Sequence, residues 1–503
     1  MSMNTWNTEM TGVKRWRTIL ISSHVSILVT LVVLPVGVAL GILLSKVLSA
    51  MNIASVIAVF GALPPSSMWA FVIGTIIMAL IIILRQYELA ATIVIAISLY
   101  LDWYLGTAFV ASIVALGLLL VFFLARSPLH PWAEPRALWL LALLFVLALF
   151  QTTRAPNFLY GAQYYVTIIF NPLIILWLGI VVARDAANVR RFFQIISVFG
   201  ALVAIHTIIQ TTTGTFLFET SHRDADALII SYFDPSATGV HRAESFFLNA
   251  DSAGIFFAVM LFIPLGLFIE SSSFLPKVLY LGEAFLLSFA LLFTYSAGAL
   301  AAACIGAIVL IALAGRMRYR IQIFLFPLIV GMVMIVWLPS QVDILLQHAT
   351  NPQELMLRNG AWQTGLRIIQ AFPLTGLGIG RDVYLLRAES YRVLAQYKSL
   401  AHPHNSYIEL AALGGIPILI VFIALLSIPI WQASRNWLRA DARNRSLLAG
   451  GIAAIMTLSF NSAFNAGWTL GPLAAIGWLI LGIVSSPLLV KNRHREVKTV
   501  EKV

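Results

Sequence analysis

The sequence predicts an all-α fold, in which a polytopic bundle of about 12–14 transmembrane helices carries a large helical loop on its extracytoplasmic side. Three observations support this prediction. Hydrophobic residues make up 60% of the 503-residue chain and charged residues only 11%, whereas soluble domains carry about 25% charged residues. Apolar runs of about 20 residues, each long enough to cross a bilayer, recur along the chain. A transmembrane β-barrel would instead show short segments of alternating polarity.

Hydropathy divides the chain into apolar runs that we interpret as membrane spans. The first run is too long for the apolar part of a signal peptide and lacks a cleavage site, so we expect it to be a signal anchor. The spans are expected near residues 19–45, 67–84, 88–104, 107–124, 137–151, 164–182, 193–211, 253–269, 277–294, 298–314, 321–338, 413–431, 447–464 and 469–487.

Basic residues collect in the short connections between these runs, which explains the net charge of +11 without a nucleic-acid partner. The positive-inside rule assigns these connections, and therefore both termini, to the cytoplasm. The single cysteine, Cys304, excludes an internal disulfide and a cysteine-based metal site, and its apolar surroundings indicate core packing. The basic segments are 14–17, Arg85, 126–136, 183–191, 315–320, 434–445 and the C-terminal tail.

Two long polar connections fall on the opposite side of the membrane, and polar loops of such length are commonly functional. They divide the chain into an N-terminal transmembrane bundle, a smaller outer loop, central transmembrane helices, a large outer loop with candidate site residues, and C-terminal helices with a basic cytoplasmic tail. The respective ranges are 1–211, 212–251, 252–338, 339–412 and 413–503.

The first part of the large loop, "NPQELMLRNGAWQTGLRIIQAFP", predicts an amphipathic helix on the outer membrane face. Asn351 can cap this helix, Glu354 completes a capping box and Pro373 closes the helix. Arg358 lies one turn before Trp362, so both can share a face, with Trp362 at the level of the lipid head groups. Two roles stay open for Arg358, a ligand contact or a side chain that reaches lipid phosphates. Apolar residues recur at helical spacing at Leu355, Trp362, Leu366 and Ile369.

The stretch "GLGIGR" at 376–381 has only a superficial similarity to a nucleotide-binding loop. It follows a proline-ended helix rather than a strand, and it lies on the outer side of the membrane. We therefore expect a tight glycine turn. A second helix is expected near 382–397, where Arg387 and Arg392 lie.

The polar segment "AHPHNSYIEL" leads directly into the next apolar run. Pro403 biases His402 toward an extended backbone. A helix that begins near Asn405 would let His404 and Glu409 face one way. Three interpretations stay open: a zinc site, although the spacing matches no zinc signature; a structural histidine; and a histidine that acts as general base or substrate contact near neutral pH.

The smaller outer loop is rich in charged residues. Basic residues on the outer side of the membrane are unusual under the positive-inside rule, and they indicate an anionic ligand. A diphosphate is the obvious candidate at a membrane surface. Structural ion pairing with the neighbouring acids is the alternative. The charged residues and histidines are His222, Arg223, Asp224, Asp226, His241, Arg242, Glu244 and Asp251.

The order of these features resembles that of the O-antigen ligase and O-antigen polymerase superfamily. The matching runs are "HRAESFFLNADSAGIFFAVMLFIPLGL", "TYSAGAL" at 294–300, "LRNGAWQTGLRIIQAFPLTGLGIG" and "HPHNSYIELAALGGIP". The resemblance covers about 240–430 and is specific in the large loop. The first part of the chain matches only as hydrophobic spans.

This resemblance implies a glycosyltransferase of the GT-C type in the bacterial cytoplasmic (inner) membrane, with an extracytoplasmic active site and without metal, cofactor or nucleotide sugar. Such an enzyme takes a saccharide from a polyprenyl-diphosphate carrier, such as undecaprenyl diphosphate, and joins it to a glycan or lipid acceptor. By position, Arg242 would hold the diphosphate, Arg358 would help to bind phosphate or sugar, and His404 would act at the acceptor hydroxyl or the leaving group. Other polysaccharide-assembly proteins are further candidate partners. The remaining substrate-binding candidates are His402, Asn405, Arg223, His241, Trp362, Arg367, Arg381 and Glu409.

One motif departs from the family pattern. The family often has Ser-Arg-Gly-Ala where this chain has Ser296-Ala297-Gly298-Ala299, so one expected cation is missing. Its candidate replacements are Arg223, Arg367 and Arg381.

Two other classes of function are alternatives. A transporter or flippase of lipid-linked or small substrates would place ionisable groups near the bilayer midplane and commonly has repeated halves. Such groups are scarce in the apolar runs, with Glu283 the main exception. A non-catalytic scaffold would not need the charged outer loops. A polymerase and a ligase share the donor and differ in the acceptor, and we lean to a polymerase because nothing specifies a lipid A core acceptor.

Overall fold

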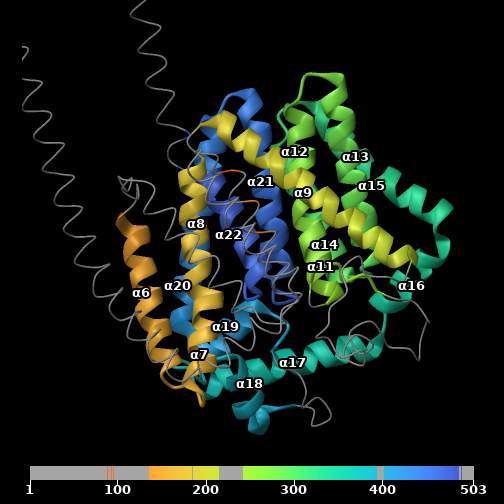
Figure 1. Ribbon diagram of the computed structural model, residues 1–503. Coiled ribbons are helices and arrows are strands. Elements are labelled where there is room, and N and C mark those ends of the chain that lie inside the picture. The colour runs from red at the N-terminus through yellow and green to blue at the C-terminus, as the bar shows by residue number, and fades with distance from the viewer. Residues whose placement is uncertain are drawn as a thin grey trace, which may run out of the picture. The chain divides into compact units, whose positions relative to one another are not determined.

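The computed structural model describes residues 135–183, 185–213, 242–247, 249–393 and 402–486, together with Glu88, Thr92, Ile95 and Leu489. The chain divides into two compact units, and one of them, Met1–Ile77 with Pro128–Trp132, lies outside the described residues. Every regular element among the described residues is a helix, which confirms the predicted all-α class (Figure 1). The spans expected near 19–45, 67–84, 88–104 and 107–124 lie outside the description, apart from three helical residues.

The helices follow the predicted apolar runs. The first described group is α6 (Pro135–Thr152), α7 (Phe158–Tyr165), the π-helical turn η1 (Val166–Phe170), α8 (Asn171–Val182) and α9 (Ala186–Thr213). The central group is α11 (Ala250–Met260), α12 (Phe262–Glu270), α13 (Phe274–Phe293), α14 (Ala297–Leu313) and α15 (Met317–Trp337). The large loop holds α16 (Pro339–Ala349), α17 (Pro352–Ala371), α18 (Arg381–Arg387), η2 (Glu389–Tyr391) and α19 (Ser406–Gly414). The last group is α20 (Ile416–Arg439), α21 (Ala442–Asn461) and α22 (Gly471–Ser485).

Five helices in the described part are long and apolar enough to cross a membrane: α9, the continuous α11–α12 pair, α13, α15 and α20. The burial of these helices separates core from periphery. The α11–α12 pair is almost wholly buried, whereas α15 exposes large apolar side chains such as Phe324 and Trp337. An apolar helix surface that the protein leaves uncovered is what a lipid-facing helix presents. The helix α22 is buried along its whole length and lies in the core.

Glycines allow the core helices α8 and α22 to touch through their backbones. A Cβ atom on Gly482 would lie 2.1 Å from the carbonyl oxygen of Leu176, and one on Gly179 would lie 2.4 Å from that of Leu479. Small residues at such crossings replace side-chain packing by close backbone contact, which is how helices associate where lipid removes the hydrophobic drive. This crossing therefore has no room for a larger side chain.

One end of the bundle gathers the basic connections. Arg190 near the start of α9 and Arg443 near the start of α21 both pair with Glu270, the last residue of α12. Lys277 near the start of α13 lies over the ring of Tyr319 near the start of α15, 5.8 Å from its centroid. Because the helices alternate in direction, the starts of α11, α14 and α19 lie at the opposite end. We call these two ends the basic end and the site end.

The large loop crosses the site end, with α17 running across the ends of the bundle helices (Figure 1). The predicted glycine turn is confirmed, since Gly376 has a positive φ of 56°. The amides of Leu377 and Gly378 donate to the carbonyl oxygens of Ala412 and Leu413, both at 2.9 Å. The turn is thereby bound to the end of α19.

The predicted helix over 382–397 is wrong in its length. Helix α18 ends at Arg387 and is followed by the short 3₁₀ turn η2. Contacts with α17 redirect the chain here: the Tyr391 ring packs edge-on against Phe372, and the amide of Val393 donates to the hydroxyl of Thr364 at 3.2 Å. Tertiary contacts override the helical propensity of this stretch.

Replacing Gly482 by valine should lower the free energy of unfolding by about 2 kcal/mol, because the new methyl groups meet the backbone of α8. Thermal unfolding of the purified full chain in detergent measures this. The control is Gly331→Val on α15, where a Cβ atom would meet nothing within 4 Å. Equal melting temperatures for both variants would contradict the close packing of α8 and α22.

Candidate active site

The side chain of Arg242 is bound to the turn between α13 and α14. Its Nε donates to the carbonyl oxygen of Thr294 at 3.0 Å, and its Nη2 donates to Oδ1 of Asp251 at 2.8 Å. The backbone is fixed next to it, because the amide of Ala243 donates to the carbonyl oxygen of Phe293 at 3.1 Å. The guanidinium is therefore bound from two sides while 22% of the side chain stays exposed.

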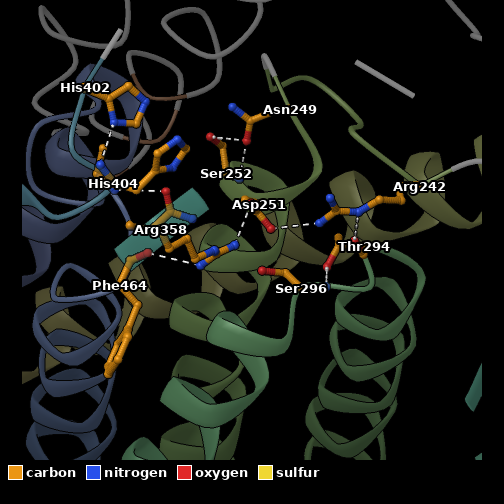
Figure 2. A network of polar contacts seen from close by, with 12 residues as sticks. Arg242, Asn249, Asp251, Ser252, Thr294, Ser296, Arg358, His402, His404 and Phe464 are labelled. Carbon is orange, nitrogen blue, oxygen red and sulfur yellow. Dashed lines mark hydrogen bonds and ion pairs between the residues drawn. The ribbon is translucent and has the colours of Figure 1, made fainter. Parts of the chain in front are cut away.

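Arg358 reaches the same carboxylate from α17. Its Nη2 donates to Oδ2 of Asp251 at 3.4 Å, and its Nη1 donates to the carbonyl oxygen of Phe464 at 3.2 Å. Figure 2 shows the guanidinium between these two groups, with the imidazoles of His402 and His404 beside it. The guanidinium is held by protein groups, and the ligand contact expected for Arg358 stays a prediction.

Asp251 is the residue on which the two arginines converge, and sequence reasoning did not select it as a site residue. Each of its oxygens takes one arginine. It lies in the first turn of α11, whose N-cap, Asn249, accepts from the amide of Ser252 at 2.8 Å. A carboxylate is favoured at this helix position by the helix dipole. The signal available in the sequence was an acid next to a helix cap at the start of an apolar span.

The predicted alternative of ion pairing with neighbouring acids applies to Arg242, since Asp251 is one of those acids. Ion pairing and ligand binding are compatible here. The carboxylate uses part of each guanidinium fork, which carries five N–H donors. The arrangement is an arginine pair held apart by one anion.

The two predicted histidines lie together at the start of α19. His404 has a positive φ of 51°, an uncommon conformation for a residue with a side chain. Its amide donates to Nδ1 of His402 at 3.2 Å, and the two rings are 4.3 Å apart. The indole of Trp362 donates to the carbonyl oxygen of His404 at 3.5 Å and its ring packs on Phe464. A strained backbone held by several contacts is typical of a functional residue.

Burial, and after it the charges of His402 and Arg358, lower the pKa of His404 to about 3, although Asp251 acts in the opposite direction. The imidazole is therefore neutral at neutral pH. A neutral imidazole can accept a proton or a hydrogen bond. Its charged form would be stabilised by an added anion beside Arg358.

Hydrogen bonds fix the histidine segment to the rest of the molecule. Asn405 is the N-cap of α19, as expected; its side chain accepts from the amides of Tyr407 and Ile408 and donates to the carbonyl oxygen of Ala463 at 2.7 Å. The amide of Ser406 donates to the carbonyl oxygen of Ser462 at 2.9 Å. The turn between α21 and α22 thus forms one wall of the site.

Glu409 is buried, and both carboxylate oxygens accept hydrogen bonds from protein hydroxyls. The partners are Tyr164 on α7 and Thr469, whose Oγ1 lies 2.7 Å from Oε2. Glu409 and Asn405 therefore support the segment that carries His404. A contact of either side chain with substrate stays a prediction.

The other predicted residues are more distant from this cluster or undescribed. Arg367 is exposed on α17. Arg381 begins α18, but its side chain is not among the described ones, and Arg223 and His241 lie outside the described residues. Among the residues that the structure describes, no three histidines, cysteines, aspartates or glutamates are grouped so that they could hold a metal ion.

These features define a class: a multi-pass helical membrane protein with an arginine–carboxylate–histidine cluster at one end of its bundle. Residues 284–423 match the family model described as O-antigen ligase. This match agrees with the resemblance seen in the sequence and supports membrane glycan processing of the O-antigen ligase or polymerase type. The match contains Arg358 and His404, whereas Arg242 and Asp251 lie before it. No curated protein matches the chain.

Replacing Asp251 by alanine should lower the free energy of unfolding by about 2 kcal/mol, because two arginines lose a charged hydrogen-bond acceptor and face each other unscreened. Asp251→Glu keeps the charge and should recover part of the loss. The control is Asp343→Ala on α16. Thermal unfolding of the full chain measures the stability of all three variants. An unchanged melting temperature for Asp251→Ala would contradict a stabilising role for the two ion pairs of Asp251.

The lowered pKa of His404 predicts a pH-dependent stability. The unfolded chain binds a proton at this histidine below its ordinary pKa of about 6.5, whereas the folded chain does not until near pH 3. Stability should therefore fall as the pH drops below about 6.5. Between pH 7 and pH 5, wild type should lose about 1–2 kcal/mol more than His404→Gln. Parallel melting curves for the two proteins across this range would refute a buried neutral imidazole.

Proposed function

We propose that the chain is a glycosyltransferase that moves a saccharide from a polyprenyl diphosphate to a glycan or lipid acceptor at the outer face of the bacterial cytoplasmic membrane. The observation that carries this proposal is the convergence of Arg242 and Arg358 on one carboxylate, beside the neutral imidazole of His404. The cluster combines anion binding with proton acceptance, and both are required to transfer a sugar from a diphosphate.

The cluster suits a diphosphate donor. Guanidinium groups match phosphate oxygens with paired donors. The starts of α11 and α14 lie next to the two arginines and add the positive ends of their helix dipoles. A bound diphosphate would compete with Asp251 for both arginines, so Asp251 keeps the arginines in position between turnovers.

The reaction assigned to this site is a displacement at the sugar. The acceptor hydroxyl oxygen bonds to the anomeric carbon, while the bond from that carbon to the phosphate oxygen breaks and its electrons leave with the diphosphate. His404 takes the hydroxyl proton. Arg242 and Arg358 stabilise the charge that develops on the departing diphosphate.

Donor binding would also prepare the base. Arg358 disfavours the charged form of His404, as does burial. A diphosphate beside Arg358 neutralises that repulsion and raises the pKa of the imidazole. The histidine then becomes a competent proton acceptor only when the donor is bound, which limits unproductive protonation.

The polarity of the bundle supports an extracytoplasmic site. The basic end carries Arg190, Arg443 and the 315–320 segment, which the positive-inside rule assigns to the cytoplasm. The site end is therefore assigned to the outer face, where lipid-linked saccharides would reach the arginines from the outer leaflet. The C-terminal tail is assigned to the cytoplasm by the same rule, and so is the N-terminus.

Replacing His404 by alanine at matched expression should abolish the long surface glycan ladder in cells and let lipid-linked repeat units accumulate. In proteoliposomes with a lipid-linked saccharide, the rate of glycan formation should fall about 100-fold or more, because the proton acceptor is lost. Arg242→Lys and Arg358→Lys should also slow the reaction, since lysine lacks the paired donors. The ladder pattern separates a polymerase from a ligase.

The control is Arg318→Ala, at the basic end. An unchanged ladder in His404→Ala cells would contradict the proposed role of this histidine. If the purified chain moved the lipid-linked saccharide across the bilayer without forming a new glycosidic bond, it would be a flippase instead.

A further inference from the structure

Asn461, the last residue of α21, is a buried amide with neither of its ends in use. The residue is 1% exposed, and neither Oδ1 nor Nδ2 has a hydrogen-bond partner in the part of the chain that the structure describes. Two other buried asparagines behave differently. Asn405 caps α19, and the Nδ2 of Asn436 donates to two backbone carbonyl oxygens. A buried amide without partners is costly and therefore needs an explanation.

The amide lies at the arginine cluster. A Cβ atom placed on Gly298, in the first turn of α14, would be 3.9 Å from Nη1 of Arg358 and 3.9 Å from Nδ2 of Asn461. The guanidinium and the amide therefore both lie within van der Waals reach of the start of α14. Figure 2 shows how Arg358 approaches this region beside Ser296. The same motif, residues 296–299, is the one in which the family often carries an additional arginine.

The position of Asn461 is fixed by the turn that follows it. Phe464 supplies the carbonyl oxygen that holds Arg358, and Ala463 supplies the one that holds Asn405. The amide of Phe464 donates to the carbonyl oxygen of Asn461 at 2.8 Å, so the backbone of Asn461 is joined to the turn that holds the arginine. This turn lies outside residues 284–423, so neither the family match nor the sequence motifs had selected it.

The amide of Asn461 carries both a hydrogen-bond donor and an acceptor, which favours a ligand that carries both as well. A phosphate offers only acceptors and would satisfy Nδ2 but not Oδ1. A sugar hydroxyl or acetamido group offers both a donor and an acceptor, and would satisfy both ends. The amide lies near the guanidinium assigned to the diphosphate. The first sugar on that diphosphate is the group that would reach the amide.

We propose that Asn461, next to Gly298 and Arg358, is a specificity-determining residue that hydrogen-bonds the first sugar of the lipid-linked donor. This inference rests on the proposed function, since it assumes a diphosphate-linked donor at Arg242 and Arg358. Contacts with the diphosphate are the same for every donor. The proposed contact with the sugar would discriminate between donors. A site built to bond a polar sugar group rejects a donor that lacks it.

The test measures the affinities of the purified full chain in lipid nanodiscs for three probes. They are undecaprenyl diphosphate without sugar, undecaprenyl-diphospho-N-acetylglucosamine and undecaprenyl-diphospho-galactose. We expect wild type to bind at least one sugar-bearing probe about tenfold more tightly than the bare diphosphate, as one well-made polar contact allows. Asn461→Leu should lose this increment and keep its affinity for the bare diphosphate. Its melting temperature without probe should be unchanged or higher, because the replaced amide has no protein partner to lose.

A second variant tests the surroundings of the amide. Gly298→Ala adds one methyl group at a distance that the fold tolerates, and it should weaken binding of the sugar-bearing probe while leaving the bare diphosphate unaffected. Gly331→Ala is its matched control, on a helix glycine with open surroundings.

Three results separate the possibilities. Equal losses for bare and sugar-bearing probes in Asn461→Leu would overturn the inference, because the residue would then hold the phosphate or the fold. Wild type that binds the sugar-bearing probes no better than the bare one would overturn it as well. Wild type that binds none of the three better than uncharged undecaprenol would refute the proposed function itself, which is a different outcome.

Discussion

The shared carboxylate of Asp251 is the constraint on which the site depends. Two guanidinium groups brought together would repel each other, and the repulsion grows where protein excludes water. Asp251 offers one oxygen to Arg242 and the other to Arg358, and so permits an arginine pair at the end of a membrane bundle. Three separate parts of the chain must meet for this to happen: the segment before α11, the first turn of α11, and α17. The path of the large loop across the site end follows from that requirement.

The groups around this centre divide into those that hold and those that are free to react. Asn405 and Glu409 have protein partners for their polar side-chain atoms, and they hold the start of α19 against the α21–α22 turn and α7. Apolar packing alone sets few directions, whereas hydrogen bonds fix them. That framework holds His404 in a conformation that its own backbone does not favour. Asn461 differs from Asn405 and Glu409, because both ends of its buried amide have no hydrogen-bond partner among the described residues.

The residues of the site lie both inside and outside the segment that matches the family model. Arg358 and His404 lie within residues 284–423, whereas Arg242, Asp251 and the Phe464 carbonyl lie on either side of it. In our proposal, each of these segments supplies a different group of the site. The large loop supplies the proton acceptor and one arginine, the segment before α11 supplies the second arginine, and the α21–α22 turn supplies the contact that would read the sugar.

The sequence by itself determined the all-α class, the positions of the long apolar helices from 135 onward, a helix start near Asn405, the glycine turn and the residues Arg242, Arg358 and His404 as candidates. These follow from hydropathy, local capping chemistry and turn preferences, which act over a few neighbouring residues, or from motif resemblance. Only the tertiary structure decided that Arg358 turns inward, that the helix after Arg381 stops at Arg387, and that Asp251 joins the two arginines. Those features depend on tertiary contacts, among them that of Arg358 with Asp251, 107 residues away in the sequence, and no local pattern records which partners a residue will find.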